Sequence, residues 1–145
     1  MSGVVGAIGL AAIMSVTSTA HAQIYVANSG NNTIGEYTTS GAVVNSSLVN
    51  GFNEPIGIAV SGNNIFVANS QGNTIGEYTA SGGVVNSSFI TGVNKPSDIA
   101  IYGNNIFITD QGNGIISEYT TSGQLINAHL IKGLSSPFFL AVVKQ

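Results

Sequence analysis

The sequence contains no cysteine, and only three basic and six acidic residues stand among its 145 residues. Without cysteine the protein has neither a disulfide nor a thiolate metal site, so its stability must come from packed secondary structure. The basic residues are Lys95, Lys132 and Lys144, which are far apart in the sequence. Phosphate-rich partners require a cluster of basic side chains. We therefore expect no nucleic acid and no anionic membrane surface as partners of the mature protein.

The N-terminal apolar stretch, residues 3–14, is too short to span a bilayer, which takes about 20 residues in a helix. Polar residues follow it, and then Ala20-His21-Ala22, a small-x-small pattern typical of signal-peptide cleavage. We predict a helical signal peptide at residues 1–22 and a mature domain at residues 23–145 that is secreted, periplasmic or at the cell surface, as in an exported bacterial protein. No basic residue precedes the stretch, so the alternatives are a start site further upstream and a lipid-facing helix in the mature protein.

The rest of the sequence repeats one pattern three times. The copies begin at Ile24, Ile65 and Ile106, which are 41 residues apart, and they align without a gap. Each copy contains four β-branched or aromatic runs, separated by Gly, Asn, Ser and Pro, which favour turns. The fourth run follows a proline, which belongs at the start of a strand because it cannot donate to a ladder. In the third copy this predicts a strand at Phe138–Val142.

Four antiparallel strands in about 41 residues are typical of one blade of a β-propeller. We predict an all-β fold of three four-stranded propeller repeats, as an open arc or as half of a six-bladed ring, because complete propellers have about four to eight blades. A homodimer would close the ring if Phe138–Val142 of one copy completed the sheet that begins at Ile24–Asn28 of the other. The alternative is a fragment of a longer propeller.

The repeat resembles the NHL repeat and the related YVTN-type propeller repeat. The resemblance rests on P-x-G-I-A-V from Pro55, G-N-x-I-F-V-A-N from Gly62, G-N-x-I-x-x-Y from Gly72 and the following Ser81-Gly82, and it extends over nearly all of residues 24–145. A more distant similarity to gluconolactonase-like propellers would imply a lactonase whose metal lies on the central axis. In a family blade, an acid usually follows the second strand and a basic residue usually precedes the third. At the first of these places the sequence has Asn28 and Asn69 and is acidic only at Asp110, and at the second it has Thr33, Thr74 and Ile115.

Asp98 is the candidate metal ligand of this sequence. It stands near the start of an innermost strand, where the central channel of a propeller opens, and its counterparts Gly57 and Phe139 are not acidic. Calcium takes about six to eight oxygen ligands, and one carboxylate supplies few of them. We therefore expect no cofactor, with one divalent metal such as calcium as the alternative. Glu54 and Lys95 precede prolines near the same channel mouth, and with Asp98 they form a candidate ligand-facing rim.

Glu36, Glu77 and Glu118 recur at one strand position of the repeat. They either form a ring of carboxylates that lines a binding surface or, in the interpretation we favour, serve as repeated side chains that are solvated or hydrogen-bonded at a blade rim. The tyrosine after each glutamate is expected to pack between blades. Asn69 and Asp110, with their counterpart Asn28, are expected to accept hydrogen bonds from loop amides two residues further on, as in Asx turns.

Catalytic residues are not evident in the mature sequence. Its only histidine, His129, replaces the serines Ser47 and Ser88 on an outer strand or loop and has no acid near it in sequence, so a Ser-His-acid relay is not supported. We predict an exported, non-enzymatic propeller module that binds a protein or a carbohydrate. The alternatives are a metal-dependent, lactonase-like hydrolase and a propeller fragment without independent activity.

Overall fold

All regular structure in residues 22–144, the part that the computed structural model describes, is β-strand. The eleven strands form three antiparallel sheets, and the predicted signal peptide lies outside this part except for Ala22. The strands are β1 (Gln23–Asn28), β2 (Thr33–Thr38) and β3 (Val43–Asn50) in the first sheet; β4 (Pro55–Ser61), β5 (Asn64–Asn69), β6 (Thr74–Thr79) and β7 (Val84–Ile90) in the second; and β8 (Pro96–Tyr102), β9 (Asn105–Asp110), β10 (Ile115–Thr120) and β11 (Leu125–Ile131) in the third.

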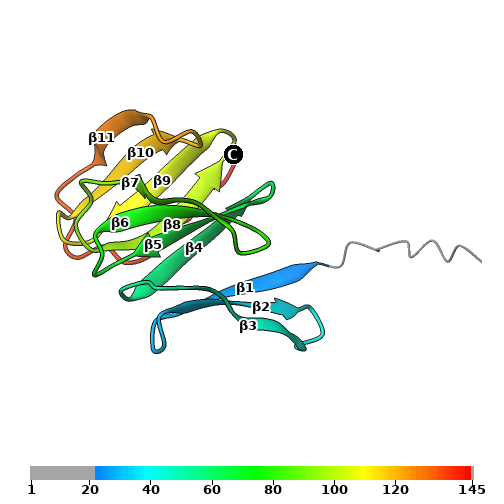
Figure 1. The fold of residues 1–145 in the computed structure, drawn as a ribbon. Coiled ribbons are helices and arrows are strands. Elements are labelled where there is room, and N and C mark those ends of the chain that lie inside the picture. The colour runs from blue at the N-terminus through cyan, green and yellow to red at the C-terminus, as the bar shows by residue number, and fades with distance from the viewer. Residues whose placement is uncertain (1–21, 145) are drawn as a thin grey trace, which may run out of the picture.

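Within each sheet, strands that are consecutive in sequence are also neighbours in space. Figure 1 shows the three sheets following one another, with β4–β7 between β1–β3 and β8–β11. The strands β4 and β8 lie side by side, and β4 also lies against β1, so the successive sheets meet along their first strands. This arrangement of antiparallel blades confirms the predicted all-β propeller fold.

The turn between the last two strands of a sheet is encoded by a threonine and a glycine. In the second sheet, the Thr79 hydroxyl accepts a hydrogen bond of 2.9 Å from the Gly83 amide, while the Thr79 amide donates to the Gly83 carbonyl. Gly82 has a φ of 88°, a left-handed conformation that glycine adopts without strain. Thr38 and Thr120 make the equivalent bonds in the other two sheets. The same short signal therefore folds all three hairpins.

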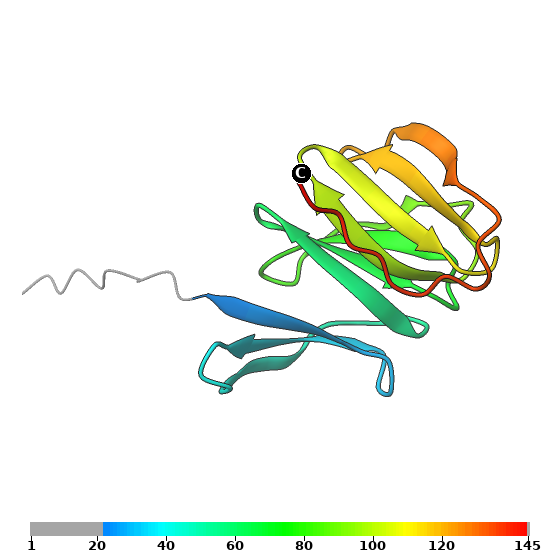
Figure 2. The same cartoon turned by 180° about the vertical axis from the view of Figure 1, so that it is seen from behind.

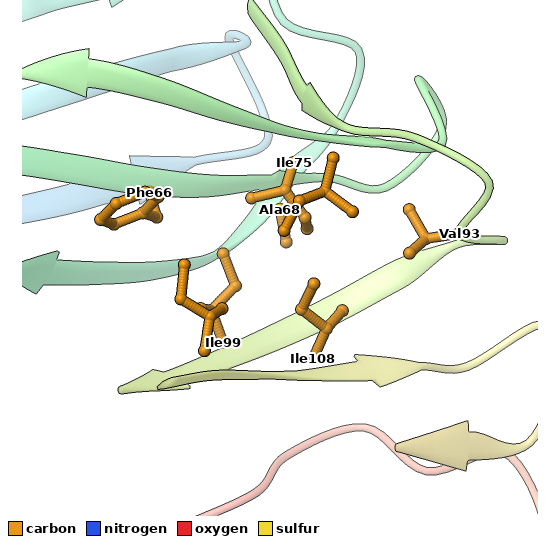
Figure 3. Close-up of a cluster of buried hydrophobic side chains, with 8 residues drawn as sticks. Phe66, Ala68, Ile75, Val93, Ile99 and Ile108 are labelled. Atoms are coloured by element: carbon orange, nitrogen blue, oxygen red, sulfur yellow. The ribbon is translucent and has the colours of Figure 1, made fainter. Parts of the chain in front are cut away.

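The strand β5 shows how the alternation of side chains builds the core. Ile65 and Val67 point to the first sheet, where they pack with Ile34 of β2. Phe66 and Ala68 point the other way, into a cluster with the third sheet. Figure 3 shows this second cluster, in which Phe66, Ala68 and Ile75 face Ile99, Ile108 and Val93. Because successive side chains of a strand alternate between faces, one central sheet can fill both interfaces of the arc.

One predicted strand is absent from the ladders. Phe138–Val142 forms no ladder with any described strand, and the first sheet has three strands instead of four. The segment nevertheless lies beside β8, where the Ser97 hydroxyl donates to the Phe138 carbonyl at 2.8 Å. Figure 2 shows it in red, running along β8. The physical reason is that a strand forms by pairing with another strand, and none of the described strands lies where the hydrogen-bonding partner of Phe138–Val142 would be.

Candidate functional site: a polar groove between the first two sheets

A groove of about 620 Å³ lies between the first and second sheets. Its lining combines a carboxylate, two amides and two hydroxyls with the apolar side chains of Leu48 and Ala80. The lining residues are Gln23, Glu36, Leu48, Asn63, Thr79, Ala80 and Ser81. A concave surface with several hydrogen-bonding groups around a small apolar spot is suited to a polar ligand.

Two sequence differences between the repeats leave this groove open. Leu48 contacts the turn at Gly82, whereas at the next interface the larger ring of Phe89 contacts the corresponding Gly123. Gln23 occupies the position of Asn64, whose amide donates a hydrogen bond of 2.6 Å to Glu77. Between the second and third sheets, the Phe89 ring and the hydrogen bond from Asn64 to Glu77 therefore occupy the places of Leu48 and Gln23 in the groove between the first and second sheets.

The acidic group of the groove is Glu36, which is buried. Near it, the hydroxyl of Tyr25 lies 2.9 Å from the side-chain oxygen of Gln23 and 3.1 Å from the Ala80 carbonyl, and it can donate to either. Burial raises the pKa of Tyr25, and the negative charge of Glu36 raises it further. Tyr25 therefore stays protonated and is a hydrogen-bond donor beside a buried carboxylate.

The other two repeated glutamates have partners inside their own sheets. Glu77 accepts from Asn64, and Glu118 accepts a hydrogen bond of 2.7 Å from Asn105. The tyrosines are also placed by the repeat, since Tyr78 is buried against the Phe52 ring with centroids 5.3 Å apart, in a T-shaped arrangement. Tyr78 thus packs between blades as predicted, and the glutamates of the second and third repeats serve their own blades.

The three predicted rim residues occupy separate places. Glu54 and Lys95 lie in the connections that enter β4 and β8, with positive φ values of 58° and 51°. Their amides donate to Asn32 and Asn73 of the preceding sheet, each at 2.8 Å. Asp98 lies on β8 and accepts a hydrogen bond of 3.0 Å from the amide of Leu140. Each of the three thus has a role in joining successive blades.

The prediction of Asx turns needs a correction. Asn69 accepts from the amide of Asn53, 16 residues before it, at 2.7 Å, and not from an amide two residues further on. Asp110 accepts from the amide of Asn94 at 3.1 Å and also from Asn113, three residues further on. The sequence pattern favoured a local bond, but the connection from the previous blade passes close enough to supply the donor instead.

A smaller cavity of about 160 Å³ brings together residues that the sequence did not link. Asp110, Ser117 and His129 all contribute to its lining. No hydrogen bond joins Ser117 to His129 within the described part of the chain, and both oxygens of Asp110 are engaged by loop donors. The cavity therefore lacks the contact between nucleophile and base that a hydrolytic triad uses.

Among residues 22–144 there is no group of three or more His, Asp or Glu side chains placed to hold a metal ion. In the same residues, no helix has the length and apolarity needed to cross a membrane.

Comparison with known proteins gives the fold its context. No protein-family model matches the chain, and no curated protein matches its sequence. Among solved structures, a streptogramin B lyase superimposes with a TM-score of 0.67 at 24% identity, covering 83% of this chain and 41% of its own. A virginiamycin B lyase from Staphylococcus aureus gives a TM-score of 0.60 at 25% identity over 80% of this chain and 40% of its own.

A computationally designed protein, Ika8, has a TM-score of 0.63 at 15% identity and covers 84% of this chain and 37% of its own. The chain thus spans about two fifths of the length of the solved structures that it matches. At these identities the likeness concerns the fold. The three antiparallel blades and these neighbours together show that the described chain is a partial β-propeller.

Proposed function

We propose that this protein is an exported, non-enzymatic propeller module that binds a carbohydrate in the groove between its first two sheets, and that its blades are repeats of the NHL or YVTN type. The observation that carries the binding role is the buried carboxylate of Glu36 in a groove of about 620 Å³ lined by amides and hydroxyls. Sugar hydroxyls can donate to the carboxylate and accept from the amides, which is the pairing that buried polar groups require.

The apolar part of the groove fits the same type of ligand. Leu48 is half-buried and lies at the groove wall, where it offers a small patch for the carbon face of a sugar ring. Thr79 and Ser81 are joined by a hydrogen bond of 3.0 Å between their hydroxyls, so one of the two keeps a free proton to donate outward. These groups together favour a neutral, hydroxyl-rich ligand over a charged one.

A glycan array probed with the full chain tests the proposal, followed by calorimetry with the best oligosaccharide. We expect saturable binding that Glu36→Gln weakens by about tenfold or more, since a hydrogen bond to a charged group contributes about 1.5–3 kcal/mol. Glu118→Gln is the matched control, because it changes the equivalent carboxylate outside the groove and should leave the affinity unchanged. Equal affinity of Glu36→Gln and the wild type would refute this site, and the absence of any glycan ligand would favour a protein partner.

A further inference from the structure

The first sheet exposes apolar side chains at positions that the other sheets bury. Ile24 and Val26 of β1 are 45% and 41% exposed, whereas their counterparts Ile65 and Val67 of β5 have no exposed surface. The counterparts in β9 are fully buried as well. The difference comes from the neighbours, because β5 and β9 have a blade on this side and β1 has none among the described residues.

The third sheet shows the same contrast on its opposite face. Ile131 and Leu134 are 48% and 37% exposed, whereas Ile90 and Val93, at the same positions of the preceding repeat, are 3% and 6% exposed. Both of these counterparts belong to the cluster between the second and third sheets. The two ends of the arc therefore present the two halves of one interface, which the inner blades already show in its assembled form.

The backbone at the two ends is complementary too. Among the described strands β1 pairs only with β2, so its other edge is free. Pro137–Val142 lies beside β8 in the place of an innermost strand and lacks a ladder partner. Ser136, just before it, has a φ of 50°, close to the 58° of Glu54 and the 51° of Lys95, which precede β4 and β8. The segment thus already holds the connection geometry of an innermost strand.

We propose that two copies of this chain close a six-bladed ring, in which Pro137–Val142 of each copy pairs with β1 of the other. The described residues form three blades, and two copies of them would give six, within the range of about four to eight that propellers use. The repeat fixes the register, since Ile58 pairs with Val67 and Ile99 with Ile108. The same offset places Leu140 opposite Val26 of the second copy.

The register also supplies a donor for Asn28. The carboxamide of Asn69 accepts from Asn53, and the carboxylate of Asp110 accepts from Asn94. The donors Asn53 and Asn94 occupy the same position in successive repeats, and Ser135 occupies it in the next. In the proposed dimer the Ser135 amide would reach the Asn28 side chain of the second copy. Side-chain packing, strand pairing and this loop contact thus all point to the same partner, a second copy in a head-to-tail arrangement that closes after two members.

The oligomeric state of the full chain, measured by light scattering after size-exclusion chromatography, tests the proposal. We expect a mass of twice the 14.7 kDa of one chain. Val26→Lys places a charge in the proposed interface and should raise the dimer dissociation constant at least about tenfold, which corresponds to ~1.4 kcal/mol. Val44→Lys is the matched control, since Val44 is similarly exposed on β3, outside the interface, and should leave the dimer intact.

Cysteine cross-linking tests the register independently, because the chain has no cysteine of its own. The double variant Val26→Cys/Leu140→Cys should form a disulfide-linked dimer, since paired strands place Cα atoms within the range of about 4.4–6.8 Å that a disulfide needs. Val26→Cys/Phe139→Cys shifts one partner to the other face and should not cross-link. A stable wild-type monomer, a larger assembly, or equal cross-linking of both pairs would overturn the proposal.

Discussion

The close approach of β4 and β8 makes Gly57 a sensitive position. A Cβ atom added to Gly57 would lie 2.6 Å from the Cα of Asp98 and 2.7 Å from the carbonyl oxygen of Ser97. Both contacts are with backbone, so no change of rotamer can relieve them. The substitution Gly57→Ala must therefore push the second and third sheets apart along their innermost strands, where they share a hydrophobic cluster.

Overpacking of a well-packed core costs about 1–3 kcal/mol, and we expect Gly57→Ala to lie in the upper part of this range because the obstacle is backbone. For a chain of this size the corresponding fall in Tm is about 4 °C per kcal/mol. Gly30→Ala is the control, since its added Cβ would meet nothing closer than the Asn28 side chain at 3.6 Å.

Urea unfolding, followed by far-UV circular dichroism at one fixed protein concentration, measures the free energy of unfolding. We expect the unfolding midpoint to fall in Gly57→Ala and to stay close to the wild-type value in Gly30→Ala. If Gly57→Ala were as stable as the wild type, with an unchanged dependence on urea, β4 and β8 could not approach each other as the structure shows.

Two further predictions concern the contacts between and within blades. Asn73 has a φ of 54°, and its side chain accepts a hydrogen bond from the Lys95 amide. Asn73→Ala should lower the free energy of unfolding by about 2 kcal/mol, because alanine loses this hydrogen bond and is strained at a positive φ, whereas Asn73→Gly should lose only the hydrogen bond, about 1 kcal/mol. Equal losses of the two variants in urea unfolding would contradict this reasoning. Burial raises the pKa of Tyr78 above its ordinary 10.0, so its contribution to stability is complete below pH 10.0 and is lost as the pH rises through the folded-state pKa. The alkaline fall in unfolding free energy should be smaller in Tyr78→Phe than in the wild type, and an unchanged pH profile would refute the assignment.

Much of the blade was predictable because its signals are local. The second of the four runs predicted in each copy forms β2, β6 or β10, since each is a short β-branched and aromatic run between turn residues. The sequence pattern placed the fourth run after the proline, whereas β4 begins at Pro55 itself, because a proline can begin a strand where its missing amide is not needed. Repetition of the same signal three times made the propeller fold evident.

The candidate site was less predictable, because it depends on gaps between elements. The sequence drew attention to Glu54, Lys95 and Asp98, which the structure places in contacts that join the blades. It gave no separate sign of the groove, whose opening depends on Leu48 being smaller than Phe89. A comparison of the copies position by position, with attention to side-chain volume, would have found that difference.

The sequence by itself determined the strands, the hairpin turns and the order of strands in each blade, because these depend on alternation and on turn residues a few positions apart. The tertiary structure decided which of the equivalent positions in the repeats are buried. Identical positions are buried in the middle of the arc and exposed at its ends, as Ile65 and Ile24 show. The physical reason is that a strand pairs with strands close to it in sequence, whereas the burial of its outward face depends on whether another blade packs against it.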